Sequence, residues 1–417
     1  MLDLIDKPFV YFPPKPHPVI SPIGRMYNKY IYMPGKKHLI KSVSHSNWEE
    51  IKALRADRNN RFLFLPNHPS HSDPQIIMES LRRIGISTHY LASYDLFLRR
   101  TKFERWAMQK SGAFSIDRES FNAKPLNHAV HTIKTGRYAL TIFPEGRPYL
   151  QNDLVTPFQN GAVYIGLAAQ KALRHEGKRV FLIPAAIKLT HMEDCLALLK
   201  NMLGVLAADI GYECDSSEDP VQMTESVAKA LMQWGLRSLG YPETAEDNLE
   251  AMRTRAAEMI IHNLEKETGV TGIEDKSLWE RALDIRTGIH KLMLFPEKNP
   301  HRVRASVMRA RKVITAMKLL SYSLDYLRAR PSLDRFGEIV ERLIEDKQSH
   351  AIPPYGNRAV YVKYGKPIDL SAVSDLGKKG QGQLMDTLSF QAQAAAQVMI
   401  DEINSGNTYP GGRLIQR

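Results

Sequence analysis

The chain has 417 residues, 43% of them hydrophobic and 24% charged, a composition that indicates a folded globular protein and excludes a disordered or fibrous one. Its net charge of +12 favours an anionic partner: lipid headgroups, a phosphorylated substrate, an acidic carrier protein or nucleic acid. No nucleic-acid-binding module is recognisable, so we expect no nucleic acid partner. With neither a signal-peptide pattern nor 18 consecutive apolar residues, we expect a cytoplasmic protein without a transmembrane helix.

Residues 1–42 are rich in Pro, Tyr and Lys, and their prolines predict an extended arm packed against the domain. The aromatic and basic side chains of this arm would also suit a membrane interface. They are Tyr27, Tyr30, Tyr32, Met33, Arg25, Lys29, Lys36 and Lys37. The segment from Ser46 to Glu49 matches a capping box and predicts a helix as far as about Arg58.

Strand and helix patterns then alternate along the chain. The expected strands are 61–66, 88–92, 113–117, 138–143 and 179–185. The expected helices are 74–84, 97–110, 125–135 and 158–173. This alternation predicts an α/β fold with a mixed central sheet flanked by helices and with ligands at the strand ends.

The first turn between a strand and a helix carries His68, with Asp73 five residues on. A histidine in such a turn can accept a proton, and a carboxylate across the turn can hold one ring nitrogen and leave the other free. Asp73 followed by Pro74 is also a good helix start, and this structural role does not exclude the chemical one. The pair therefore predicts a base and the group that orients it.

Three later turns carry further candidates. Arg118 just past a strand suits a phosphate, because the guanidinium is a planar fork of donors. Glu145 and Arg147 flank Gly146, which permits a tight turn after the next strand. Pro184 interrupts the last strand of the series and indicates an edge or a strand end. Taken singly, Arg118 and Glu145 could equally form plain surface or local contacts.

The order of these motifs, NHxxxxD, GxxxxDR, FPEG and IP, resembles the glycerolipid acyltransferase family over about residues 45–190 and 358–403. The resemblance implies that His68 is the general base for the acceptor hydroxyl and that Asp73 orients it. It also implies that Arg118, Glu145 and Gly146 bind a glycerol phosphate and that Pro184 belongs to the acyl-donor region. The family uses acyl-CoA or acyl carrier protein as co-substrate, without a cofactor or a metal.

The chain departs from the family pattern in three places. The FPEG motif usually continues with Thr-Arg-Ser, whereas Arg147 follows directly here, so Arg147 is the candidate replacement for the phosphate-binding arginine. Ser115 stands where the second motif commonly has Phe, and Ser93 stands near where many members carry Lys. These departures concern the identity of the acceptor more than the type of reaction.

Residues 191–355 break the alternation and predict a large all-helical insertion before the last strand. Its helical patterns are 194–208, 220–238, 245–267, 278–292, 302–328 and 332–346. The pattern at 302–328 is strongly basic, which fits either a solvated face or a surface for an anionic partner. Residues 356–405 supply a strand, 358–364, and a closing helix, 384–403. The predicted domains are therefore an N-terminal arm, 1–42, an acyltransferase core, 43–190 and 356–405, and the insertion, 191–355.

The sequence thus predicts an acyltransferase of glycerolipid synthesis, peripherally bound to the anionic inner face of the membrane, with a lysolipid or glycerol-phosphate acceptor. A first alternative is a non-catalytic lipid-binding or scaffold protein that retains the fold. A second is a metal-dependent hydrolase with His68, His71 and Asp73 as ligands. In the usual cluster of such hydrolases another histidine would stand where this chain has Pro74, so we expect no metal.

Overall fold

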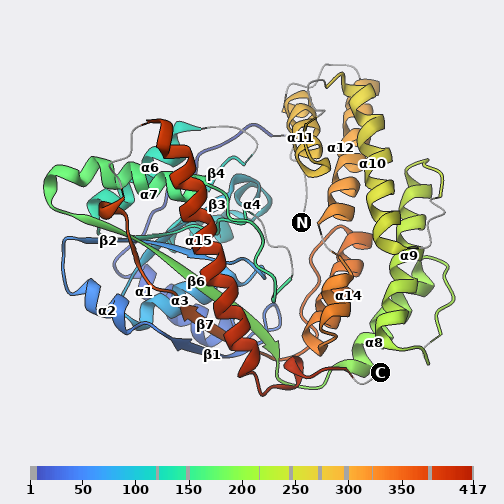
Figure 1. The fold of residues 1–417 in the computed structure, drawn as a ribbon, viewed down its shortest axis with the longest axis horizontal. Helices are drawn as coiled ribbons and strands as arrows, with labels where there is room; N and C mark the ends of the chain where they lie inside the picture. Colours follow the sequence, from blue (N-terminus) through green and yellow to red (C-terminus); the bar gives the residue numbers. More distant parts are fainter. Residues whose placement is uncertain are drawn as a thin grey trace. The chain divides into compact units, whose positions relative to one another are not determined.

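The computed structural model describes residues 7–118, 122–146, 151–215, 217–243, 248–270, 275–294, 300–321, 323–373 and 378–415. The chain divides into two compact units (Figure 1). One, Phe9–Glu193 with Pro353–Gly412, contains the sheet, and the other consists mainly of Asp194–Ile352 and is helical. The predicted α/β fold is confirmed.

The described residues of the first unit contain a mixed eight-stranded sheet with the order β1-β7-β6-β2-β5-β3-β4, and β8 also pairs with β6. The strands are β1 (Ile40–Ser46), β2 (Asn60–Pro66), β3 (Thr88–Ser93), β4 (Ala113–Ile116), β5 (Ala139–Thr141), β6 (Arg179–His191), β7 (Arg358–Tyr364) and β8 (Ile368–Asp369). From β6 to β4 all neighbours are parallel, so their carboxyl ends share one edge of the sheet.

Helices cover both faces of this sheet. The helices of this unit are α1 (Ile20–Tyr27), the π-helix η1 (Asn28–Tyr32), α2 (Glu49–Arg55), α3 (Asp73–Arg83), α4 (Tyr94–Arg99), α5 (Lys102–Lys110), α6 (Ala123–Thr135), α7 (Gly161–Leu173) and α15 (Lys378–Ser405). Short 3-10 turns lie at Arg174–Glu176, Leu370–Ala372 and Pro410–Gly412. Leu63 and Leu65 of β2 pack in a cluster with α6, α7 and α15, whereas Phe62 and Phe64 pack with α2 and α3. Because β2 alternates between two buried faces, it reads as a continuous apolar run, and burying each such side chain contributes about 1.5–3 kcal/mol.

The helical unit contains α8 (Leu196–Asp209), α9 (Pro220–Ser238), α10 (Leu249–Thr268), α11 (Leu278–Leu294), α12 (Pro300–Leu320), α13 (Asp325–Ala329) and α14 (Leu333–Gln348). In the chain it lies between β6 and β7, which pair with each other antiparallel. Two strands follow the helical unit, since β8 comes after β7, whereas the sequence predicted only one. Among the described helices, none is both long enough and apolar enough to cross a membrane.

The basic helical pattern at 302–328 forms two helices, α12 and α13, and part of its charge is paired. Arg309 Nε lies 3.2 Å and Lys312 Nζ 2.7 Å from the carboxylate of Glu267. Lys318 Nζ donates to the main-chain oxygen of Asp346 at 3.0 Å. These contacts weaken the prediction of a free basic surface on this helix.

The N-terminal prediction is only partly correct. A main-chain hydrogen bond from the Ser115 N–H to Phe12 O, at 3.1 Å, holds the extended residues before α1 against β4, and Ser115 Oγ also accepts the Phe12 N–H at 2.7 Å. Residues 20–32, however, are helical, and Ile40–Ser46 form the strand β1. The capping-box prediction was wrong: α2 has no side-chain cap, and Asn47 adopts a left-handed turn with φ of 60°.

The prediction that Pro184 marks an edge or a strand end was also wrong. Pro184 lies inside the 13-residue strand β6, where Leu65 of β2 is its partner. On the other side of β6 the neighbour changes from β8, at Leu182, to β7, at Ala185. Pro184 O accepts the Gly365 N–H at 2.8 Å. The nitrogen and the carbonyl oxygen of one strand residue point to the same side, so the Pro184 nitrogen lies on the side where β8 ends and β7 begins. A missing N–H costs little there.

Candidate active site

The centre of the site is a hydrogen-bonded pair, His68 and Asp73, at the carboxyl end of β2. His68 Nδ1 lies 2.7 Å from Asp73 Oδ2, and the same oxygen accepts the Ser70 N–H at 2.8 Å. Asp73 is fully buried, whereas the His68 side chain is 15% exposed. Asp73 is the first residue of α3, but no side chain caps this helix through a hydrogen bond, so its carboxylate serves the loop and the imidazole.

Asn67 fixes the point at which β2 turns away from the sheet. Its Oδ1 accepts the Ile187 N–H at 2.7 Å, and its Nδ2 donates to Ile187 O at 3.1 Å. The side chain therefore continues the pairing of β2 with β6 past Pro66, while the main chain is free to turn at His68. Asn67 is the first residue of the NHxxxxD motif, and its role follows from this geometry alone.

Glu145 holds the main chain of His68 from the neighbouring strand. Its Oε1 accepts the His68 N–H at 2.6 Å, and its Oε2 accepts bonds from the main-chain N–H and the hydroxyl of Thr156. The side chain is 3% exposed. With both oxygens used inside the protein, this geometry favours a positioning role for Glu145 over direct contact with a substrate.

Arg118 and Gly146 complete the cluster. Arg118 Nη1 donates to Gly146 O at 3.0 Å, and its Nη2 lies 3.7 Å from Asp95 Oδ1. Gly146 has a φ of 78°, and a Cβ there would meet Gln159 Nε2 at 2.7 Å, so the turn requires glycine. The Arg118 side chain is 33% exposed, which leaves part of its guanidinium available to an anion.

Burial shifts the pKa values of the acid–base groups in this cluster. It lowers the pKa of the His68 imidazole to about 3, and the Arg118 charge acts in the same direction. It raises the pKa of the Asp73 carboxyl well above the usual value, although the Ser70 N–H opposes this. It also raises the pKa of Glu145 to about 7, against its hydrogen bonds. In the tautomer that donates Nδ1–H to Asp73, Nε2 of a neutral His68 can accept a proton at pH 7.

The structure brings five of the seven predicted site residues into one connected group: His68, Asp73, Glu145, Gly146 and Arg118. Pro184 is buried and pairs with Leu65 of β2. Leu65 lies three residues before His68. Arg147 lies outside the described residues. His71, the third residue of the metal alternative, is exposed.

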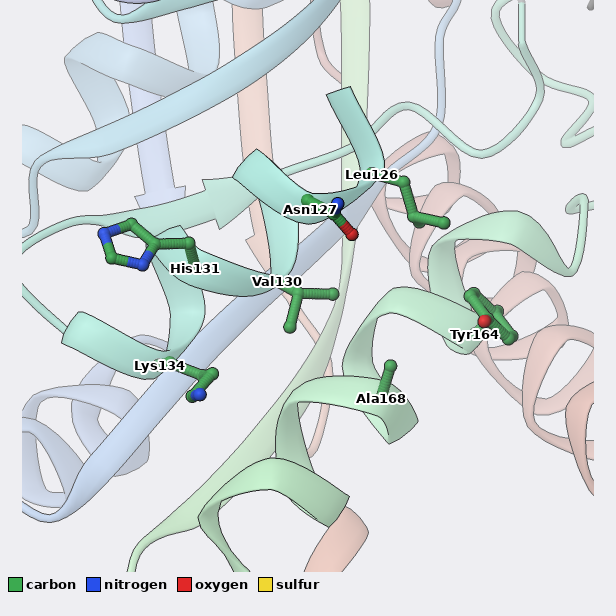
Figure 2. A pocket seen from close by; sticks show the side chains of 7 residues that line it. All are labelled: Leu126, Asn127, Val130, His131, Lys134, Tyr164 and Ala168. Carbon is green, nitrogen blue, oxygen red and sulfur yellow. The ribbon is translucent and has the colours of Figure 1, made fainter. Parts of the chain in front are cut away.

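No three His, Cys, Asp or Glu side chains in the described part of the chain are grouped so that they could hold a metal ion. The metal alternative at His68, His71 and Asp73 therefore gains no support from the geometry. A shallow hollow of about 370 Å³ lies between α6 and α7 (Figure 2). Its lining residues are Leu126, Asn127, Val130, His131, Lys134, Tyr164 and Ala168, none of which belongs to the cluster around His68.

The contacts of Glu145 predict the result of replacing it. Glu145→Ala leaves the His68 N–H and the Thr156 hydroxyl without their acceptor, so we expect a loss of about 1–3 kcal/mol in the free energy of unfolding. Because His68 then shifts, turnover should fall about 100-fold with little change in KM for the acceptor. Urea denaturation and steady-state kinetics measure both effects.

Thr156→Val is the matched control, since it removes one donor to Glu145 and leaves the bond to His68 in place. It should lower turnover much less than Glu145→Ala does. A Glu145→Ala variant with normal turnover and a raised KM would instead mean that the carboxylate contacts the acceptor.

The fold and the site together define an α/β domain that presents a His–Asp base at the carboxyl ends of its strands, beside an arginine. Residues 42–188 match the family model described as Acyltransferase, so the chain contains an acyltransferase domain over this segment. The match includes every described site residue, confirms the resemblance seen in the motifs and supports acyl transfer as the reaction. No match was found among curated proteins.

Proposed function

We propose that the protein is an O-acyltransferase that moves a fatty acyl group from a thioester, acyl-CoA or acyl carrier protein, to a hydroxyl of a lysophospholipid or glycerol-phosphate acceptor. The observation that carries this proposal is the His68–Asp73 pair within one connected cluster with Arg118. The Acyltransferase match over residues 42–188 supports the reaction type.

The reaction follows from the chemistry of these groups. Nε2 of His68 takes the proton of the acceptor hydroxyl as the oxygen attacks the thioester carbonyl carbon. The tetrahedral intermediate collapses, the ester C–O bond remains, and the C–S bond breaks. The leaving thiolate then takes the proton back from His68, so that the free base returns. A positioned base of this kind accelerates proton transfer by about 10²–10⁴-fold.

Arg118 supports an acceptor with a phosphate. Its guanidinium lies beside the Glu145–Gly146 turn and is partly exposed, so a phosphate bound there would place a nearby hydroxyl close to His68. Among the described residues, Arg118 contacts a main-chain carbonyl, which carries no net charge, and the Asp95 carboxylate, which lies 3.7 Å away.

The proposal is tested by incubating the purified protein with acyl-CoA or acyl carrier protein and a panel of acceptors, with mass spectrometry of the lipid products. We expect transfer to lysophosphatidate or glycerol phosphate, and Arg118→Ala should raise KM for these acceptors about 10–100-fold. KM for monoacylglycerol, which lacks the phosphate, should not change. Vesicle binding without any acylated product across the panel would instead support the lipid-binding or scaffold alternative.

The lowered pKa of His68 predicts the pH dependence of the reaction. A base is active when unprotonated, so a depressed pKa extends activity to lower pH. An ordinary imidazole would lose about tenfold in kcat/KM between pH 7.5 and 5.5. We expect kcat/KM of this protein, measured with an acceptor whose phosphate does not titrate in this range, to stay nearly constant. The Glu145 carboxyl, whose pKa is raised to about 7, titrates in the same range, so the measurement is repeated with Glu145→Gln. An acid limb centred near pH 6.5 that persists in Glu145→Gln would contradict the burial of the imidazole.

A further inference from the structure

The helical segment formed by α1 and η1 is amphipathic with its apolar side turned outward. Six apolar residues that recur at helical spacing are more than two-fifths exposed: Val19, Ile23, Met26, Tyr27, Tyr30 and Ile31, called here the apolar face. In an ordinary surface helix such residues would turn toward the core. An exposed apolar stripe of this kind indicates a surface that something else covers.

The opposite side of the same segment is polar and ties it to the sheet unit. Ser21 Oγ donates to Lys110 O at 3.0 Å, Arg25 Nη2 donates to Ser87 Oγ at 2.7 Å, and Asn28 Nδ2 donates to Gln75 O at 3.2 Å. These bonds connect the segment to α5, to the start of β3 and to α3. They hold the apolar face outward as part of a folded surface.

The neighbouring helix α5 extends this surface. Phe103 is 72% exposed and Trp106 is 42% exposed, and their rings stack with centroids 5.7 Å apart. The contact between α1 and α5 joins these aromatic side chains to the apolar face. Exposed aromatic side chains, tryptophan and tyrosine above all, suit the boundary between the polar headgroups and the acyl chains of a bilayer.

The segment that carries the apolar face is strongly positive. Between residues 9 and 48 the chain carries neither Asp nor Glu, and its cations there are Lys15, Arg25, Lys29, Lys36, Lys37 and Lys41. Lys36, Lys37 and Lys102 are exposed. A protein partner of any charge could cover apolar side chains, but apolar and aromatic residues among cations match an anionic lipid surface in particular.

The surface adjoins the loop that carries His68. Tyr32 of η1 contacts His38 with ring centroids 4.4 Å apart, and His38 Nδ1 hydrogen-bonds with Ser72 Oγ at 2.6 Å. Ser72 directly precedes Asp73. On the α4 side, Asp95 pairs with Arg118 at 3.7 Å. A bilayer on this surface would therefore lie next to the elements that hold the candidate acceptor site.

We propose that the apolar face of α1 and η1, with Phe103 and Trp106, docks onto an anionic membrane. The docking deepens the proposed function, because it makes the acceptor a lipid drawn from the bilayer to which the protein is bound. Binding to the membrane itself does not depend on turnover and can be measured without it.

Vesicle co-sedimentation tests the docking. The full chain should bind phosphatidylcholine vesicles that contain phosphatidylglycerol, and it should bind pure phosphatidylcholine or vesicles in high salt much less. The triple variant Ile23→Ser, Met26→Ser, Ile31→Ser should bind at least about tenfold less tightly.

Two further measurements test the lysines and the tryptophan of this surface. Lys36→Glu with Lys37→Glu should weaken binding by about fivefold for each lysine. Brominated lipids should quench tryptophan fluorescence in the wild type, and Trp106→Phe should remove that quenching.

The matched control is Phe390→Ser with Val398→Ser, which removes two exposed apolar side chains of α15, 69% and 56% exposed, outside the proposed surface. Its vesicle binding should equal that of the wild type.

The docking proposal would be overturned if the triple variant bound vesicles as tightly as the wild type, or if the wild type bound no vesicles. So would a dimer in solution that the triple variant dissociates. Failure of the docking alone leaves transfer to soluble glycerol phosphate intact, whereas failure of the proposed function leaves vesicle binding without product.

Discussion

His68→Ala should lower kcat by about 10²–10⁴-fold, because it removes the group that accepts the proton of the acceptor hydroxyl. The fold should survive, since the His68 side chain is partly exposed and its main-chain bond to Glu145 does not need the imidazole. Product formation from acyl-CoA and lysophosphatidate measures the loss, and circular dichroism with thermal melting reports the fold.

His71→Ala is the matched control for this experiment. His71 is an exposed histidine three residues further along the same loop, so its removal should leave turnover within a few-fold of the wild type. If His68→Ala were fully active, the proposed base would be wrong. If His71→Ala were as inactive as His68→Ala and the protein bound a metal ion stoichiometrically, the metal-hydrolase alternative would be favoured.

Asp73→Asn should cost activity without costing stability. The amide can keep the shape of the carboxyl group but not its charge. It therefore neither stabilises the imidazolium that forms during the reaction nor fixes the tautomer of the neutral imidazole. We expect kcat to fall by about 10²–10⁴-fold, as for the loss of an orienting carboxylate in other His–Asp pairs.

The sign of the stability effect follows from the raised pKa of Asp73. A carboxyl whose pKa is raised by folding makes the folded state less stable as the pH rises above the unfolded pKa. The neutral amide does not carry this penalty, so Asp73→Asn should melt at the same temperature as the wild type or higher at pH 7. A large drop in melting temperature would show instead that the carboxylate is needed for folding. The loss of activity would then reflect unfolding and not a role of Asp73 in catalysis.

The sequence predicted the parts of this protein that local patterns encode. β2 and the first half of β6 were visible as apolar runs, and His68 and Asp73 were visible because both belong to one turn. β1 was missed because Ile40–Ser46 alternates polar and apolar residues only weakly, and because the cap-like residues after it indicated a helix. The full length of β6 was missed because Pro184 is a strand breaker unless its nitrogen faces a gap between neighbours, which only the sheet order reveals.

The roles of Glu145 and Asn67 could not be predicted from local sequence. Glu145 acts on a main-chain N–H that lies 77 positions away, and Asn67 acts on Ile187, which lies 120 positions away. A motif match could place Glu145 at the site, but only the geometry shows that both of its oxygens bind the protein. The helix α1 was missed for a different reason. The prolines of residues 1–42 indicated an extended chain, but Pro22 lies in the first turn of α1, where proline is tolerated.

The antiparallel pairing of β6 with β7 makes these two strands the arms of one β-hairpin. His191 and Arg358 are its last paired residues, and residues 192–357 are its loop. Since closure entropy grows only with the logarithm of loop length, exchanging a tight turn for so long a connection costs roughly 3–4 kcal/mol. A whole folded module can thus be gained or lost at this point during evolution while the strand register stays the same.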